Sequence, residues 1–153
     1  MKTLIAFVTK GGTTAEYAAI IANALKRNGL DFDVVDLKKQ KPDLKLYENV
    51  IVGSGVRAQR IYSEFFDFLD KNDLSKKRVA IFFSSNEAGN LKSYEGFVRK
   101  YVKPTVERYP KIKIVAIDGF GGRMKFFGRT ISDSTDPDKA RAWADVLARK
   151  LKS

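Results

Sequence analysis

The chain has 153 residues, a length that fits one domain with an apolar core of its own. It contains neither cysteine nor histidine, which excludes disulfides, thiol nucleophiles, imidazole bases and Cys/His zinc sites. Any redox chemistry would therefore have to come from an organic cofactor. The formal net charge of +11 favours attraction to polyanions, anionic lipid surfaces or acidic partners.

The first apolar run, Lys2–Val8, predicts a central parallel strand because both of its faces are apolar. A Gly- and Thr-rich turn, Thr9–Thr14, follows it, and the apolar spacing predicts a helix over Thr13–Asn28 that stops at Gly29. Free backbone N–H groups at the positive end of a helix dipole can hold a phosphate. The turn alone supports this reading and an ordinary strand-to-helix loop equally.

The middle of the chain repeats the pattern. A strand over Phe32–Leu37 alternates in polarity, as at a sheet edge, and the basic segment 38–45 reads as a solvated loop. Strand three, Val50–Val52, is expected to end in a turn at Gly53-Ser54-Gly55. A loop with Arg57 and Arg60 then leads into a helix over Ser63–Asn72.

The remaining elements complete the alternation. Strand four, Val79–Phe83, is followed by a third polar loop, Ser84–Asn90. A helix over Ser93–Arg108 should kink or break at Pro104, and strand five is Ile112–Ile117. A long connection, Asp118–Thr135, precedes a final helix that begins at Asp136-Pro137 with an N-cap and a proline in its first turn.

Five strands that alternate with helices predict an α/β fold with one doubly wound domain over residues 1–153. The expected sheet is parallel, with strand order 2-1-3-4-5 and helices on both faces. Ligands bind at the carboxyl edge of such sheets, where all three polar loops lie. No apolar run approaches the roughly 20 residues that span a bilayer, and the N-terminus lacks signal-peptide features, so we expect a cytoplasmic protein.

The first turn resembles the T/S-x-T-G-x-T phosphate motif of the flavodoxins. Thr9, Gly12 and Thr14 match it, whereas Gly11 stands where that family usually has a hydroxyl residue. The segment from Leu46 to Ser54 is similar to the family's third strand. The resemblance implies a flavodoxin-like fold that binds FMN and transfers electrons through the flavin.

A closer likeness is to the flavodoxin-like subgroup that contains menaquinone-dependent protoporphyrinogen oxidase. It rests on Thr9–Thr14, on Gly53–Arg57 with Ser63–Phe65 after it, and on the basic aromatic segment Arg123–Phe127. That oxidase carries a longer segment after strand four than this chain does. The likeness implies the fold and the flavin, and it leaves the porphyrin substrate open.

The resemblance also implies a three-loop flavin site with no catalytic side chains and no metal. Side-chain contacts to the phosphate are expected from Thr9 and Thr14, with backbone N–H groups supplying the rest. The expected cofactor-binding residues are Thr9, Lys10, Gly11, Gly12, Thr13, Thr14, Ser54, Gly55, Val56, Arg57, Ser84, Ser85, Asn86, Glu87 and Gly89. No aromatic residue occupies the two ring loops, although Tyr62 and Tyr94 lie just beyond them.

Positive charge near the ring should raise the reduction potential of the flavin. A cation about 7 Å from a reduced, anionic flavin stabilises it by roughly 2 kcal/mol at an effective dielectric near 20. For one electron this shifts the potential upward by on the order of 100 mV. Arg57 and Arg60 are the expected sources, with Lys92 and Arg123 as further candidates, although the arginines could equally face solvent.

Three functional alternatives follow. The first is an FMN-dependent redox protein whose expected partner is a redox protein or a quinone. Its more specific form, which the resemblance implies, is a quinone-dependent protoporphyrinogen oxidase of haem biosynthesis that acts at the membrane surface. The basic charge with Phe126-Phe127 would suit an anionic membrane surface, although adjacent phenylalanines are more often packing residues. The second, a signalling receiver, is strongly disfavoured because Thr9 and Ser54 replace the acidic residues that it requires. A basic nucleic-acid-binding domain is disfavoured because no RNA or DNA motif accompanies the Lys and Arg residues.

Overall fold

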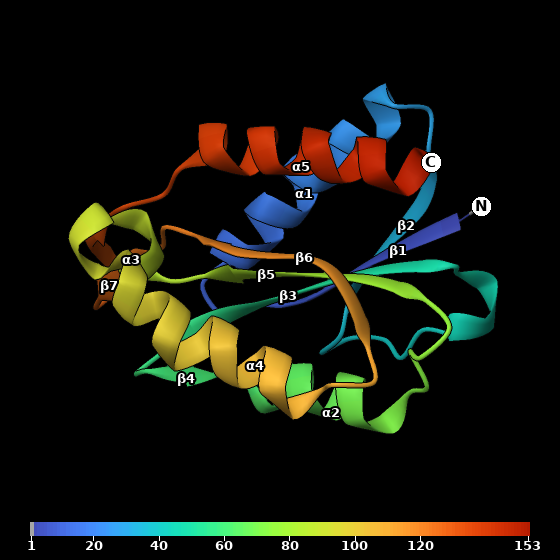
Figure 1. The fold of residues 1–153 in the computed structure, drawn as a ribbon. Coiled ribbons are helices and arrows are strands. Elements are labelled where there is room, and N and C mark those ends of the chain that lie inside the picture. Colours follow the sequence, from blue (N-terminus) through green and yellow to red (C-terminus); the bar gives the residue numbers. More distant parts are fainter. Residues whose placement is uncertain (1) are drawn as a thin grey trace.

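The computed structural model describes residues 2–153, in which a parallel sheet lies between two helical layers (Figure 1). The strand order β2-β1-β3-β5-β6 is that of five successive parallel strands, which confirms the predicted order 2-1-3-4-5. The two-residue strand β4, Arg60–Ile61, adds antiparallel to the end of β3. The parallel strands are β1 Lys2–Val8, β2 Asp31–Asp36, β3 Asn49–Arg57, β5 Arg78–Ser84 and β6 Lys113–Phe120.

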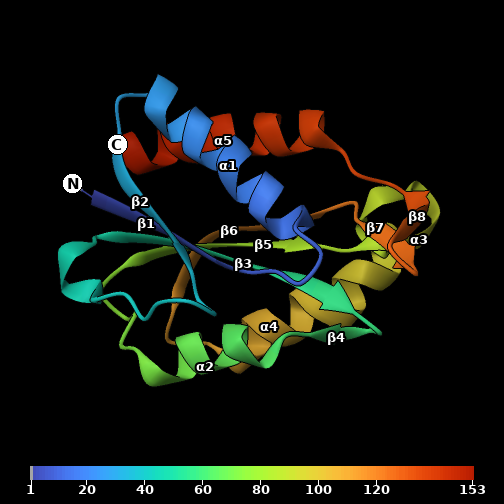
Figure 2. The same cartoon turned by 180° about the vertical axis from the view of Figure 1, so that it is seen from behind.

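Helices cover both faces of the sheet and create two apolar cores. Helices α1 and α5 lie side by side on one face, and α2, α3 and α4 lie on the other (Figures 1 and 2). Ile21 of α1 and Leu147 of α5 are almost fully buried in the first core, and Phe65 of α2 and Phe97 of α3 are fully buried in the second. The helices are α1 Thr13–Arg27, α2 Ser63–Lys71, α3 Leu91–Phe97, α4 Lys103–Arg108 and α5 Pro137–Lys152.

Strand β3 is longer than the sequence suggested. The predicted turn at Gly53-Ser54-Gly55 is wrong, since all three residues lie in the nine-residue strand. A Cβ atom on Gly53 would lie 2.1 Å from Cζ of the Phe82 ring, so the glycine makes room for an aromatic side chain of the next strand. The chain reverses later, at Ala58 and Gln59, which both adopt positive φ between β3 and β4.

The third long helix of the prediction is divided into segments. Helix α3 begins at Leu91, two residues before the predicted Ser93, and passes into a π-helical segment over Val98–Val102. Pro104 lies in the first turn of the following α4. A proline lacks the N–H that a continuous helix requires, and a wider turn before it accommodates this loss. The predicted interruption is therefore present, at the helical turn that precedes the proline.

The predicted connection from Asp118 to Thr135 contains regular structure. Strand β6 continues to Phe120, and a hairpin follows it, formed by β7 Arg123–Phe126 and β8 Arg129–Asp133. Phe127 and Gly128 form its two-residue turn, both with positive φ. We call residues 123–133 the β7–β8 hairpin. It lies beside α3, beyond the carboxyl ends of the central strands (Figure 2).

Strand β1 begins and helix α5 ends near each other at the opposite, amino edge of the sheet (Figures 1 and 2). Arg78 at the start of β5 fixes the end of α5, since its guanidinium donates to the carbonyl oxygens of Lys150 at 3.0 Å and Leu151 at 2.9 Å. Within residues 2–153 no helix combines the length and apolarity that crossing a membrane requires.

Candidate functional site

The carboxyl ends of the central strands open into a cavity of about 680 Å³. All three predicted polar loops contribute to its wall, and the β7–β8 hairpin supplies a fourth side. Parallel strands bring their carboxyl ends to one edge, so loops distant in sequence meet there. The site is therefore built from the ends of β1, β3 and β5 and from a hairpin that follows β6.

The turn after β1 is shaped to expose backbone N–H groups. Gly12 is the N-cap of α1 with φ +90°, and no side chain caps this helix terminus. The Gly12 N–H donates to Thr9 Oγ1 at 2.9 Å, which closes the turn and leaves the Thr9 hydroxyl proton free to donate elsewhere. A Cβ atom on Gly11 would meet no atom within 4 Å. The open turn and uncapped helix terminus together form an anion-binding concavity.

Thr14 links the first turn to the third strand of the site. Its hydroxyl lies 2.7 Å from the hydroxyl of Ser84, and both side chains are buried. Gly55 allows this approach, because a Cβ atom there would lie 3.2 Å from Thr14 Oγ1 and 3.0 Å from the Tyr62 ring. Thr14 is thus part of the cavity wall, and its hydroxyl already forms one hydrogen bond within the protein, with Ser84.

Tyr62 is the aromatic residue that the second loop brings to the cavity. The Lys10 ammonium lies 4.9 Å from its ring centroid, within the range of a cation–π interaction. Burial raises the pKa of the Tyr62 hydroxyl, which therefore stays protonated at neutral pH. Tyr94, the other aromatic candidate, lies outside the cavity wall and donates to Asp118 instead.

The third loop is fixed by contacts with neighbouring elements. Glu87 forms an ion pair with Lys100 at 3.1 Å, and the Tyr101 hydroxyl donates to Glu87 at 3.5 Å. Asn86 Oδ1 accepts from the Ser134 hydroxyl at 2.9 Å. These contacts hold the end of β5 against both the π-helical segment and the base of the β7–β8 hairpin.

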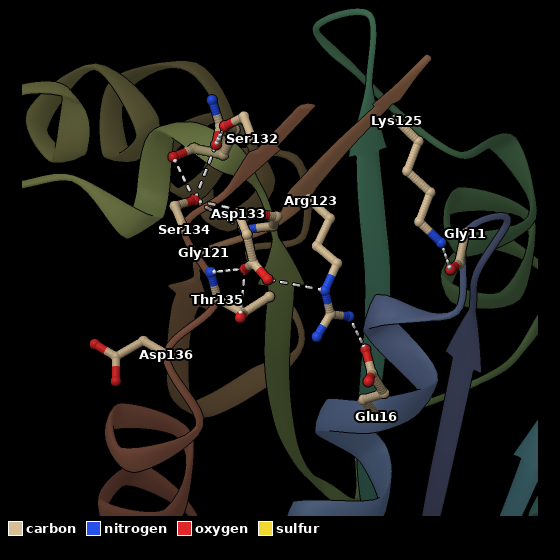
Figure 3. A network of polar contacts seen from close by, with 12 residues as sticks. Gly11, Glu16, Gly121, Arg123, Lys125, Ser132, Asp133, Ser134, Thr135 and Asp136 are labelled. Atoms are coloured by element: carbon tan, nitrogen blue, oxygen red, sulfur yellow. Dashed lines mark hydrogen bonds and ion pairs between the residues drawn. The ribbon is translucent and has the colours of Figure 1, made fainter. Parts of the chain in front are cut away.

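Ion pairs and hydrogen bonds hold the β7–β8 hairpin over the cavity (Figure 3). Arg123 bridges Glu16 in the first turn of α1 and Asp133 on the opposite hairpin strand, the latter at 3.2 Å. The hydrogen bond to Glu16 raises the pKa of the Arg123 guanidinium. Lys125 Nζ donates to the carbonyl oxygen of Gly11 at 3.2 Å. The hairpin is therefore attached to the turn that follows β1.

Most of the predicted site residues line this cavity. The exceptions are Gly12, Ser54 and Gly89. Ser54 is fully buried in β3, where it donates to the Gly55 carbonyl at 2.8 Å and accepts from the Tyr62 N–H at 3.4 Å. Gly89 instead packs on Ser134, whose carbonyl oxygen would lie 2.5 Å from an added Cβ atom.

The cavity wall also contains residues from outside the three predicted loops, of which only Tyr62 and Arg123 were named as candidates near the ring. One group is Tyr62, just beyond the second loop, and Tyr101 of the π-helical segment. The other comes from the β7–β8 hairpin, whose alternating polarity before a Phe-Gly pair is a hairpin signal. The additional lining residues are Ala58, Gln59, Tyr62, Tyr101, Gly122, Arg123, Met124, Lys125, Phe127 and Gly128.

The cavity carries an excess of positive charge. Lys10, Arg57 and Lys125 line it, and none of them forms an ion pair with an acidic side chain within residues 2–153. Of the other basic candidates, Arg123 lines the cavity but is already paired, whereas Arg60 does not line it. An anionic ligand is the natural occupant of such a cavity.

A second hollow of about 510 Å³ lies at the opposite, amino edge, between the ends of α2 and α4. It contains the exposed ion pair of Arg108 with Asp70 at 2.9 Å and lies away from the three polar loops. Across residues 2–153, no group of three His, Cys, Asp or Glu side chains could hold a metal ion. The carboxyl-edge cavity is therefore the candidate functional site.

Comparisons of the sequence and of the fold with known proteins point to flavodoxins and to a dehydrogenase that is named for a quinone. The chain is 36% identical over 73 residues to the protoporphyrinogen IX dehydrogenase [quinone] of Escherichia coli K12, a match that covers 47% of this chain. The match spans 40% of the length of that curated relative. Among solved structures, the oxidised flavodoxin 1 of Bacillus cereus superposes with a TM-score of 0.67 at 20% identity, covering 99% of this chain and 97% of that one.

A flavodoxin from the domain Archaea superposes over the full length of both chains, with a TM-score of 0.69 at 18% identity. These structural likenesses confirm the predicted fold. A family model described as a flavodoxin domain matches residues 4–131, which include every residue that lines the cavity. The chain therefore belongs to the flavodoxin domain family, and this membership implies FMN as its cofactor.

Proposed function

We propose that the chain is an FMN-dependent redox protein whose single domain, residues 1–153, binds the flavin in the carboxyl-edge cavity. The observation that carries this proposal is the uncapped N-terminus of α1, which opens into a cavity with unpaired cations. The volume of about 680 Å³ lies within the range of about 300 to 1,000 Å³ that is usual for cofactor sites. The residues of the cavity thus fit a phosphate-bearing flavin.

Each part of the cavity has a role in this proposal. The turn Thr9–Thr14 holds the phosphate, with Thr9 and Thr14 as side-chain donors and backbone N–H groups as the remaining ligands. The loops Ser54–Arg57 and Ser84–Gly89 flank the ring. Tyr62 offers an aromatic face, and Arg57 adds positive charge that favours the reduced, anionic cofactor. The bound FMN supplies the electron-transfer chemistry, and the chain binds and orients it.

A visible spectrum tests the proposal. Apoprotein titrated with FMN should show flavin absorption bands, quenched flavin fluorescence and saturable binding. Failure of the apoprotein to bind FMN under reconstitution would overturn the assignment. A salt-dependent gel shift with nucleic acid, together with no flavin binding, would favour the basic nucleic-acid-binding alternative instead.

A quinone-linked activity at a membrane surface is a second candidate, and one feature of the β7–β8 hairpin favours it. Phe127 is 91% exposed and Phe126 is 62% exposed, and their rings pack against each other at 4.4 Å between centroids. Lys125 and Arg129 flank them and form no ion pair among the described residues. Exposed aromatic rings beside cations suit the interface of an anionic membrane.

The E. coli relative is named for a quinone and protoporphyrinogen IX, and these two compounds are the candidate partners of this chain in this second proposal. Co-sedimentation with vesicles that contain an anionic lipid tests the membrane contact. A Phe126→Ser/Phe127→Ser variant should bind the vesicles at least about tenfold more weakly. Leu46→Ser, at an exposed apolar residue elsewhere, is the control and should bind as the wild type does. Equal binding by all three proteins would overturn this candidate.

A further inference from the structure

We propose that Lys125 of the β7–β8 hairpin is a ligand of the cofactor phosphate and completes the site that the turn after β1 begins. The inference rests on the proposed function, because it concerns how the bound FMN is held. Lys125 lies 114 residues from Gly11 in the chain, yet its ammonium reaches the Gly11 carbonyl at 3.2 Å (Figure 3). The ammonium therefore already lies at the turn that offers its N–H groups to the phosphate.

The charge of a phosphate monoester is the first reason for this assignment. The group carries about −1.5 to −2 charges at neutral pH, whereas a helix N-terminus offers only about half of one positive charge. The hydroxyl groups of Thr9 and Thr14 contribute hydrogen bonds without net charge. Of the other cations near this turn, Lys10 packs over the Tyr62 ring and Arg123 pairs with Glu16. Lys125 is the cation whose ammonium contacts the backbone of the turn.

The donor geometry of Lys125 supports the same role. An ammonium has three donor protons, and the Gly11 carbonyl uses one of them. No other hydrogen bond of this ammonium occurs among residues 2–153, so two protons remain for an anion. A carbonyl partner leaves the positive charge unneutralised, unlike the carboxylates that bind Arg123. The Gly11 carbonyl thus holds the Lys125 ammonium in place and leaves its charge and two of its protons available to an anion.

The base of the hairpin fixes where Lys125 can reach. Ser134 connects to Asn86 and to Gly122, whose N–H donates to the Ser134 hydroxyl at 3.2 Å. Arg123 ties the hairpin to α1 at Glu16. The same ion pair neutralises Glu16, a carboxylate in the first turn of α1 that would otherwise repel a phosphate. The hairpin therefore offers the Lys125 ammonium to the phosphate. Through Arg123 it also neutralises the Glu16 carboxylate, which would repel the phosphate.

Comparison of FMN with riboflavin tests the proposal, since riboflavin has the same ring without the phosphate. Equilibrium titrations of apoprotein followed by flavin fluorescence give both affinities. Lys125→Gln should weaken FMN binding by about 10- to 100-fold, the usual effect of losing a charged hydrogen bond, and should leave riboflavin binding within about twofold. Lys125→Arg should recover most of the FMN affinity. Arg129→Gln removes a charge from the same hairpin outside the cavity and should change neither affinity more than about threefold.

A second measurement uses ionic strength. Raising the salt from about 0.02 to about 0.5 M should weaken FMN binding more in the wild type than in Lys125→Gln, because screening acts on the interaction that the variant lacks. Equal losses of FMN and riboflavin affinity would show that Lys125 only shapes the turn. An FMN affinity that depends on Lys10→Gln and not on Lys125→Gln would also overturn the proposal. Wild-type protein that binds neither flavin would instead refute the proposed function.

Discussion

Replacing Thr14 with valine removes one hydroxyl and keeps the branched shape of the side chain, which separates its structural role from its binding role. Thr14 is 1% exposed and Ser84 is 6% exposed, and their hydroxyls lie 2.7 Å apart. In the variant, the buried Ser84 hydroxyl loses its hydrogen bond with residue 14. The free energy of unfolding of the apoprotein should therefore fall by about 1 to 3 kcal/mol.

The binding role predicts a further effect that Ser84→Ala should not share. If the Thr14 hydroxyl donates to the phosphate, Thr14→Val should weaken FMN binding about fivefold or more, which corresponds to about 1 kcal/mol. Ser84→Ala breaks the same internal hydrogen bond but keeps the Thr14 hydroxyl at the cavity wall. The Ser84→Ala variant should therefore lose less FMN affinity than Thr14→Val.

Two assays check this reasoning. Urea unfolding of the apoproteins gives the stabilities, and the double variant Thr14→Val/Ser84→Ala completes a cycle. The double variant should lose less stability than the sum of the single variants, because it leaves no buried hydroxyl unpaired. Strictly additive losses would show that the two hydroxyls do not interact. An FMN affinity that Thr14→Val leaves untouched would show that the phosphate lies elsewhere.

Three other measurements follow from the structure. Gly121→Ala should lower both stability and FMN affinity, because its Cβ atom would lie 1.6 Å from a backbone carbonyl oxygen at the hairpin base, whereas Gly11→Ala meets no atom within 4 Å and should fold normally. In a redox titration, Arg57→Ala should lower the potential by up to about 100 mV, and Arg60→Ala, outside the cavity, should lower it much less; equal shifts would contradict the placement of the charge. Burial, with a hydrogen bond to an aspartate, raises the pKa of Tyr47 to about 12, so the stability it contributes is complete below about pH 10 and is lost as the pH rises toward 12. Tyr47→Phe should reduce that alkaline loss in urea unfolding, and an unchanged loss would assign it to other groups.

The architecture was predictable because its signals are local. Apolar runs such as Lys2–Val8 are buried on both faces, and Asp136-Pro137 does begin the final helix, with the Asp136 carboxylate accepting from the Lys139 N–H at 3.0 Å. The loops Thr9–Thr14 and Ser84–Asn90 follow parallel strands, so topology alone brings them to one edge. The strand order required no information beyond these patterns, whereas the family was predicted from the resemblance of Thr9–Thr14 and of the segment from Leu46 to Ser54 to flavodoxin motifs.

The missed features depend on partners distant in the sequence. In the sequence, Gly53 is typical of a turn. The structure places the Phe82 ring against it, and this contact explains why a glycine lies inside β3. The β7–β8 hairpin is largely exposed, so the alternation of polar and apolar residues in β7 marks no buried face and does not show where the hairpin packs. The contact of Lys125 with Gly11 depends on how the hairpin docks, which no pattern in either segment encodes.

The position of the chain termini has a practical consequence. The start of β1 and the end of α5 both lie at the amino edge, at the opposite end of the strands from the cavity (Figure 1). A linker attached to either end would hold the protein on an electrode with its cavity turned toward the solution. Electron exchange with a dissolved partner could then be recorded without the support covering the site, whereas direct exchange with the electrode would have to cross the length of the strands.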